Sequence, residues 1–303
     1  MDFGLMRSGR IATRLSALAL VCLSAVGAAR AGVFDAPAGA RILSDVQYGK
    51  AGEKPLLMDL ALPKTSGRKA CPAVLWIHGG SWKKGSRSPN VAAYLAGHGY
   101  VAASIDYRLS QEAVFPAQIH DCKAAVRFLR AHAKDYNIDP KRIGVLGASA
   151  GGHLAALLGT SGGVEGLEGD CGSPGFSSRV QAVCDFFGPT DLTVLAGIPG
   201  MVRNPVSDLL GGPVSDKLEL AKLASPMTHV SRGDPPVFIV HGELDVLVPI
   251  QQSERFSEAL RKHGVDVKLL RVKNAGHGFG NGSDPSMEQI ARQVWRFFDR
   301  TLK

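Results

Sequence analysis

The stretch Gly147-Ala148-Ser149-Ala150-Gly151 constrains the fold of this chain most strongly. Residues 142–146 before it form a short, mostly apolar segment that is typical of a buried strand, and residues 150–158 after it form a small apolar helix. A serine at the tip of a sharp strand-to-helix turn forces neighbouring elements close together, and glycine two residues away on either side removes the collision. The sequence therefore predicts a nucleophilic serine, Ser149, at the end of a strand.

Strand-like and helix-like segments alternate over the rest of the chain. The expected strands are residues 42–48, 56–62, 73–77, 100–105, 142–146, 180–187, 237–240 and 265–272, the first two as an antiparallel pair. The expected helices are residues 91–98, 116 to about 137, 150–158, 250–263 and 286–298. This alternation predicts a mostly parallel central sheet with helices on both faces. With the serine turn, it predicts an α/β-hydrolase fold in residues 32–303, with residues 190–230 as a small lid-like insertion.

Backbone donors for an oxyanion are expected at two places. The motif His78-Gly79-Gly80-Ser81-Trp82 directly follows a predicted buried strand, and its glycines let backbone N–H groups approach a ligand. We assign the oxyanion hole to the N–H groups of Gly80, Ser81 and Ala150, because acyl transfer needs donors where the carbonyl oxygen becomes negative. Trp82 is expected as a wall of the substrate pocket or as core, and His78 as a structural residue of the loop.

The general base is expected to be His277. A serine hydroxyl needs a base, and on this scaffold the chain order is serine, acid, histidine. His277 lies in a glycine-flanked loop after the last predicted strand, which places it at the strand ends. His229 is the alternative, whereas His153 on the serine's own helix is expected to point away from the turn.

The orienting acid is expected to be Asp245. Both Glu243 and Asp245 follow the predicted strand 237–240, and Asp245 lies deeper in the loop. Asp185 and Asp191 are more distant alternatives, which we interpret as structural residues of a turn and a loop.

The N-terminal 31 residues have the pattern of a secretory signal peptide. Arg7, Arg10 and Arg14 precede an apolar run over residues 15–29, and Ala29-Arg30-Ala31 resembles a cleavage site. The run is short for a membrane span, so we expect removal of the signal, without stable membrane insertion, rather than a retained anchor. The expected location is therefore periplasmic or secreted.

Composition excludes some partners and leaves one redox question open. The chain has 35 Lys and Arg against 27 Asp and Glu, scattered without a basic run carrying interleaved aromatic residues, so nucleic acid is not expected as a partner. No C-x-x-C pair suggests a metal site. Export permits disulfides, and Cys171 and Cys184 flank a Gly-, Ser- and Pro-rich loop, so we expect them to pair. The alternative is that all four cysteines after the signal are buried free thiols.

Several motifs together resemble a known group of enzymes. The matching motifs are His78 to Trp82, Asp106-Tyr107-Arg108-Leu109, Phe115-Pro116-Ala117-Gln118, Ile138-Asp139-Pro140, Gly147 to Ala156, Phe187-Gly188-Pro189-Thr190-Asp191, His241-Gly242 with Asp245, and Ala275-Gly276-His277-Gly278. The chain resembles secreted α/β-hydrolases described as bifunctional feruloyl and acetyl xylan esterases, and is similar to arylformamidase-like and hormone-sensitive-lipase-like esterases. Ser81 departs from the pattern, because many relatives have a third glycine there.

The resemblance implies the same triad and oxyanion residues, and neither a metal nor a cofactor. The expected substrate is a small-molecule or polysaccharide ester, and export favours an acylated carbohydrate with an acetyl or feruloyl group. The alternatives are an arylformamidase-like amide hydrolase, a peptidase of the prolyl-oligopeptidase type, and a non-catalytic binding domain. The short stretch before the first core strand speaks against the peptidase, and the presence of all three triad candidates speaks against the binding domain.

Overall fold

A single eight-stranded sheet runs through the molecule. The computed structural model describes residues 40–64, 69–195 and 204–303. The strand order is β1-β2-β4-β3-β5-β6-β7-β8, in which β2 runs antiparallel to both of its neighbours and the pairs from β4 to β8 are parallel. The strands are β1 (Arg41–Ala51), β2 (Lys54–Leu62), β3 (Cys71–Ile77), β4 (Val101–Ile105), β5 (Ile138–Ala148), β6 (Ala182–Phe186), β7 (Val237–Gly242) and β8 (Val267–Val272).

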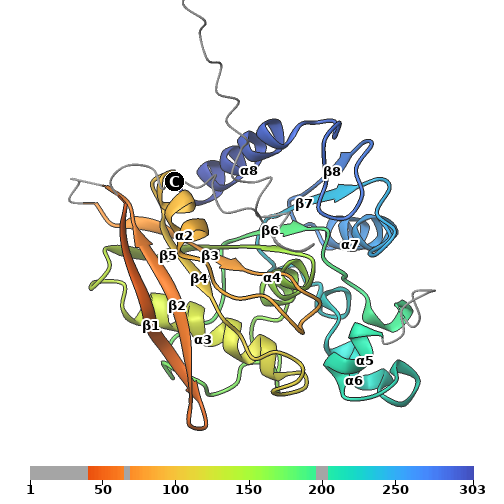
Figure 1. Cartoon of the computed structure of the whole chain (residues 1–303), viewed down its shortest axis with the longest axis horizontal. Coiled ribbons are helices and arrows are strands. Elements are labelled where there is room, and N and C mark those ends of the chain that lie inside the picture. Colours follow the sequence, from red (N-terminus) through yellow and green to blue (C-terminus); the bar gives the residue numbers. More distant parts are fainter. Residues whose placement is uncertain (1–39, 65–68, 196–203) are drawn as a thin grey trace, which may run out of the picture.

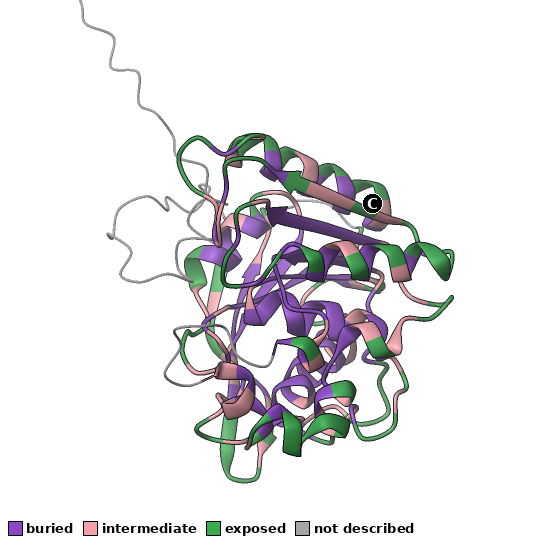
Figure 2. Cartoon of the chain, turned by 90° about the vertical axis from the view of Figure 1, so that its right-hand side faces the viewer, coloured by how far each residue is buried: buried purple, intermediate pink, exposed green. Residues whose placement is uncertain are grey.

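Helices cover both faces of this sheet (Figure 1). Helices α2 (Pro89–Ala96) and α8 (Met287–Leu302) pack on one face, where they enclose a core that contains Trp76 and Phe298. Helices α3 (Ala117–Ala131), α4 (Ala150–Thr160) and α7 (Gln251–Lys262) pack on the other. Figure 2 shows the buried residues gathered on the strands and on the helix faces turned toward them. These two layers of helices on one sheet confirm the predicted α/β-hydrolase fold.

The central strands are apolar along their whole length because both of their faces are covered. All seven residues of β3 and all five of β6 are buried, as expected for parallel strands between two helical layers. By contrast, β1 is largely exposed and lies at the edge of the sheet. The long parallel region thus provides a rigid platform, and the loops at its carboxyl edge are where a site is expected.

Two sequence predictions need correction. The helix that begins after Pro116 ends at Ala131 rather than near Asn137, because residues 132–137 form turns that lead directly into β5. The predicted disulfide between Cys171 and Cys184 is contradicted by the structure. Strand alternation explains this, since Cys184 belongs to the core on the α2 and α8 face, whereas Cys171 belongs to the core on the opposite face.

The insertion over residues 190–230 consists of short helical pieces in its described parts. They are η1 (Leu192–Val194), α5 (Pro205–Leu210), η2 (Val214–Asp216), α6 (Leu218–Leu223) and η3 (Pro226–His229). Asn204 caps α5 by accepting the N–H of Val206, and Gly211 ends that helix in the left-handed region that suits glycine. In Figure 1, α5 and α6 lie together at the lower right, below α7.

Candidate active site

Ser149 lies at the junction of β5 and α4, in a strained backbone conformation with φ 56° and ψ −120°. The two flanking glycines are required by space. A Cβ atom on Gly147 would lie 2.1 Å from the carbonyl oxygen of Gly151, and one on Gly151 would lie 2.1 Å from that of Ile77. The sharp turn that the sequence motif predicts is therefore present.

The structure brings Ser149, His277 and Asp245 into one hydrogen-bonded chain, although they come from three separate loops. Oγ of Ser149 lies 3.0 Å from Nε2 of His277, and Nδ1 of His277 lies 2.7 Å from Oδ2 of Asp245. Because a carboxylate only accepts, Nδ1 carries the imidazole proton and Nε2 can accept the serine proton. This is the arrangement that activates a serine hydroxyl.

Asp245 is held as an anion by its surroundings. Burial alone would raise the pKa of this carboxyl, but the nearby rings of His241 and His277 outweigh burial and bring the pKa well below its usual range. Its Oδ1 atom also accepts the backbone N–H groups of Leu247 and Val248, each at 2.9 Å. The acid is thus fixed in orientation and charge.

The alternative acids occupy other structural positions. Glu243 pairs with Arg271 at 3.0 Å on the surface. Asp191 caps η1 by accepting the N–H of Thr193. Asp185 is fully buried on β6, where burial raises the pKa of its carboxyl to about 7. None of the three hydrogen-bonds to His277 among the described residues.

The alternative histidines are likewise engaged elsewhere. Nδ1 of His78 lies 2.7 Å from its neighbour's carbonyl oxygen, and the ring stacks on Tyr107 with 4.3 Å between centroids. Nε2 of His229 contacts the carbonyl of Leu223 at 2.8 Å. Both rings therefore hold local structure, as expected for His78.

The loop after β3 borders the same cavity as the serine and has backbone N–H groups without a protein acceptor among the described residues. Gly80, Ser81 and Trp82 all have positive φ, at 112°, 55° and 56°, which turns successive N–H groups to one side. In the described part of the chain, the N–H groups of Gly80 and Ser81 donate to no protein acceptor. Ser81 and Ala150 line the same cavity as Ser149 and His277, and Gly80 is the residue before. Backbone donors beside the serine are one of the elements that an oxyanion hole needs.

The cavity over Ser149 is small and apolar. Its volume is about 70 Å³, and Trp82 forms part of its wall. The lid-like insertion contributes Leu195, Asn204, Pro205 and Val206 to the lining, which the sequence alone did not single out.

His153 supports the tryptophan wall in a way that the sequence prediction did not include. The indole Nε1 of Trp82 donates to Nδ1 of His153 at 3.2 Å, and Nε2 of His153 lies 2.7 Å from the carbonyl of Ala224. Burial lowers the pKa of His153 to about 4, so it is neutral at pH 7 and its Nδ1 can accept. The only sequence signal for this role is a lone polar residue in an otherwise small apolar helix.

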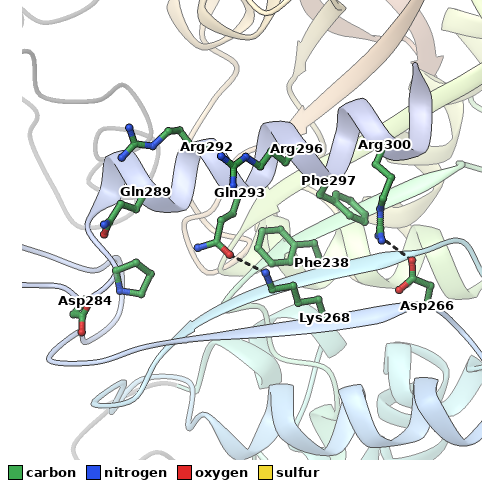
Figure 3. A pocket seen from close by; sticks show the side chains of 11 residues that line it. Phe238, Asp266, Lys268, Asp284, Gln289, Arg292, Gln293, Arg296, Phe297 and Arg300 are labelled. Atoms are coloured by element: carbon green, nitrogen blue, oxygen red, sulfur yellow. Dashed lines mark hydrogen bonds and ion pairs between the residues drawn. The ribbon is translucent and has the colours of Figure 1, made fainter.

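A larger hollow lies between α8 and β8, away from Ser149. Its volume is about 670 Å³ and its lining is largely ionic. Figure 3 shows Lys268 reaching Gln293 and Arg300 reaching Asp266 across it. The described residues that line this hollow include no serine or cysteine, and its Lys268 and Asp266 side chains are paired with neighbours across it.

The described ranges hold neither a metal cluster nor a membrane span. Within them, no three His, Cys, Asp or Glu side chains gather as a metal site requires. No described helix combines the length and the apolar character that spanning a bilayer demands.

The fold and the geometry around Ser149 define the protein as an α/β-hydrolase.

Comparison with known proteins narrows this class. The BD-FAE family model matches residues 58–260, so the chain belongs to the BD-FAE family of esterase domains. Esterase LipQ of Mycobacterium tuberculosis is 32% identical over 262 residues, which cover 84% of this chain but only 61% of LipQ. This chain therefore spans about three fifths of the length of that relative.

Two solved structures are similar over most of this chain. A truncated form of a carbohydrate esterase from gut microbiota shares 31% identity with a TM-score of 0.75, covering 86% of this chain and 96% of that one. An acetyl ester-xyloside bifunctional hydrolase from Caldicellulosiruptor lactoaceticus shares 29% identity with a TM-score of 0.69, covering 82% and 90%.

Proposed function

We propose that this protein is a serine carboxylic ester hydrolase with Ser149 as nucleophile, His277 as base and Asp245 as orienting acid. The hydrogen-bonded chain from Ser149 Oγ through His277 to Asp245, at 3.0 and 2.7 Å, carries this proposal. The esterase names of the relatives by sequence and by structure support the reaction class.

The proposed mechanism follows from the positions of these groups. His277 takes the proton of Ser149 as the oxygen attacks the ester carbonyl, and the negative charge that develops meets the N–H groups of Gly80, Ser81 and Ala150. One such donor contributes about 3 to 4 kcal/mol of transition-state stabilisation. His277 then protonates the leaving alcohol, and water, activated by the same histidine, hydrolyses the acyl-enzyme.

The cavity supports a short acyl group. At about 70 Å³ it is far smaller than the usual pocket of several hundred Å³ for a whole ligand, so only the acyl half of an ester enters it. An acetyl group suits this apolar space, whereas a feruloyl ring would have to remain outside. Together with the names of the two similar structures, this favours acetylated carbohydrate as the substrate.

The place of action follows from the first 31 residues, which lie outside the described residues. Their sequence pattern supports export through a cleaved signal peptide. Mass spectrometry of the protein recovered from the periplasm or medium tests this, because a mature N-terminus at residue 32 is expected. An intact leader on membrane-bound protein would contradict export with cleavage.

Hydrolysis of an acyl panel tests the function. Acetyl, butyryl and octanoyl nitrophenyl esters, acetylated xylan, methyl ferulate and N-formylkynurenine are compared for wild type and Ser149→Ala. We expect acetyl esters to be the best substrates and the variant to be inactive. Efficient turnover of N-formylkynurenine with none of acetylated sugars would instead indicate an amidase, and an active variant would remove Ser149 from the mechanism.

A further inference from the structure

A second histidine, His241, contacts the acid of the triad. It lies on β7 just before the loop that carries Asp245, and its side chain is completely buried. Its Nε2 atom lies 2.8 Å from the carbonyl oxygen of Val248 and 3.3 Å from Oδ2 of Asp245. Its Nδ1 atom lies 2.7 Å from Oγ of Ser253 on α7. One ring therefore connects the sheet, the acid loop and a helix.

The partners of His241 determine where its proton lies. The carbonyl oxygen of Val248 can only accept, so Nε2 carries the hydrogen and Nδ1 accepts from the hydroxyl of Ser253. The same nitrogen lies 3.3 Å from Oδ2 of Asp245, the oxygen that also accepts from His277, so the polar N–H is beside the carboxylate. His241 thus donates to the backbone of the acid loop and lies against its carboxylate.

The contact between His241 and Val248 fixes the backbone of the loop that carries Asp245. Oδ1 of Asp245 accepts the N–H of Val248, while the carbonyl of Val248 receives the N–H of His241. Without the ring, the Val248 carbonyl would lose its partner in a buried space, and the loop could rotate the carboxylate away from His277. A displacement of about 1 Å in such a group can lower a rate about 100-fold.

The charges around the ring are few among the described residues. Asp245 is the ionised neighbour, and Asp185 on the adjacent strand β6 is the other titratable group that interacts with it. The remaining neighbours, Ser253, the carbonyl of Val248 and the edge of Phe187 at 6.4 Å, carry no charge.

We infer that His241 is a positioning residue for the reaction: its Nε2–H group holds the carbonyl of Val248, whose own N–H donates to Asp245, and so keeps the carboxylate of Asp245 turned toward His277. The inference rests on the proposed function, because it assigns His241 a role only through Asp245. It predicts that loss of this donor lowers kcat more strongly than it changes KM, because His241 does not itself line the acyl cavity and reaches it only through Val248.

Three substitutions separate the donor from the rest of the ring. His241→Leu removes both ring nitrogens, His241→Gln places an amide N–H near the position of Nε2, and His241→Asn places one near Nδ1. We expect kcat to fall about 10- to 100-fold in the Leu and Asn variants and to recover within about threefold in the Gln variant. Since the Gln and Asn variants are both polar, this pair keeps the test valid if the Leu variant fails to fold. Equal losses in the Gln and Asn variants would overturn the inference.

A control measures the effect of losing a partly buried hydrogen bond elsewhere. Tyr100 is buried on the α8 side of the sheet, and its hydroxyl donates to Asp299 at 2.6 Å. Tyr100→Phe should lower the melting temperature without changing kcat below that temperature. A fall in kcat equal to that of His241→Leu would show that general destabilisation, not positioning, explains the loss.

Two measurements decide the question. In a double-mutant cycle with Asp245→Asn, we expect His241→Leu to add less than about twofold to the loss of kcat that Asp245→Asn causes alone. In proton NMR spectra, we expect the downfield signal of the N–H between His277 and Asp245 to weaken in His241→Leu and to persist in His241→Gln. A full additional loss in the double variant would overturn the positioning role. If Asp245→Asn alone left kcat unchanged, the proposed triad itself would fail, which is a different result.

Discussion

The molecule contains two polar networks with buried charges, and only one of them opens onto the cavity over Ser149. Beneath the loop of residues 161–178, Nζ of Lys123 donates to Glu168 at 2.7 Å and to the carbonyl of Ser161 at 2.6 Å. Arg127 donates to the carbonyls of Glu168 and Gly172. This ionic cluster of Lys123, Arg127 and Glu168 ties a loop to α3.

The triad network is built from similar contacts but ends differently. Its last member is the Ser149 hydroxyl, which lines a cavity beside backbone N–H groups that donate to no acceptor in the described part of the protein. The comparison teaches that burial of charge is common to both networks and does not mark a reactive site. What distinguishes the site is a nucleophile at the open end, placed in a strained turn.

The largest expected effect is a loss of activity when the triad network is broken. His277→Ala removes the base, so kcat should fall about 10⁶-fold while the free energy of unfolding changes by about 1 kcal/mol or less. Steady-state kinetics with nitrophenyl acetate and urea titration check the two halves of this prediction. A variant that keeps more than about a hundredth of wild-type kcat would show that another group acts as base.

A substitution in the ionic cluster should lower stability and leave the activity unchanged. Glu168→Gln leaves the ammonium of Lys123 buried without its anion, and because Glu168 is partly exposed we expect a loss of about 2 kcal/mol in unfolding free energy. The kcat and KM values should remain those of wild type. If the variant lost activity at a temperature where it is folded, the separation between the two networks would break down.

The unfolding free energy should depend on pH through Asp185, which belongs to neither of the two networks. Burial raises the pKa of its carboxyl to about 7 in the folded protein, from an ordinary value of 3.8. The folded state therefore binds the proton more tightly, and stability falls as pH rises from about 4 to about 7. Relative to Asp185→Asn, wild type should lose about 2 to 3 kcal/mol of unfolding free energy between pH 5 and pH 8. Parallel stability curves for the two proteins, measured by urea titration, would contradict this.

The smallest effect is expected at the cavity wall. Trp82→Phe removes the indole N–H that donates to His153 and enlarges the space over Ser149, at a cost of about 1 kcal/mol in stability. The ratio of kcat/KM for butyryl over acetyl esters should rise about 3- to 10-fold. An unchanged ratio would mean that Trp82 does not limit the length of the acyl group.

Local chemistry made much of the fold predictable from the sequence. The turn at Ser149 follows from Gly147 and Gly151, because a Cβ atom at either position would lie 2.1 Å from a backbone oxygen. The chain order of serine, acid and histidine led to the loops that follow the last two strands. The glycine-flanked loop favoured His277, and the deeper position of Asp245 in its loop favoured it over Glu243.

What depends on three-dimensional packing was not predictable in the same way. Cys171 and Cys184 are neighbours along the chain, but the strand that carries Cys184 turns it to the opposite face. The contacts of Trp82 with His153 and of Asp245 with His241 form only when the fold brings these residues together, and the sequence around each histidine does not specify which residue it contacts. The short helices of residues 190–230 similarly depend on the neighbours that they cover.

Covalent trapping tests the central assignment most directly. Diethyl 4-nitrophenyl phosphate reacts with an activated serine, and peptide mapping by mass spectrometry locates the diethylphosphoryl group. We expect one adduct, on the peptide that contains Ser149, formed in step with the loss of esterase activity and absent from Ser149→Ala. Complete inactivation with the label on another residue would contradict the assignment of Ser149 as the nucleophile.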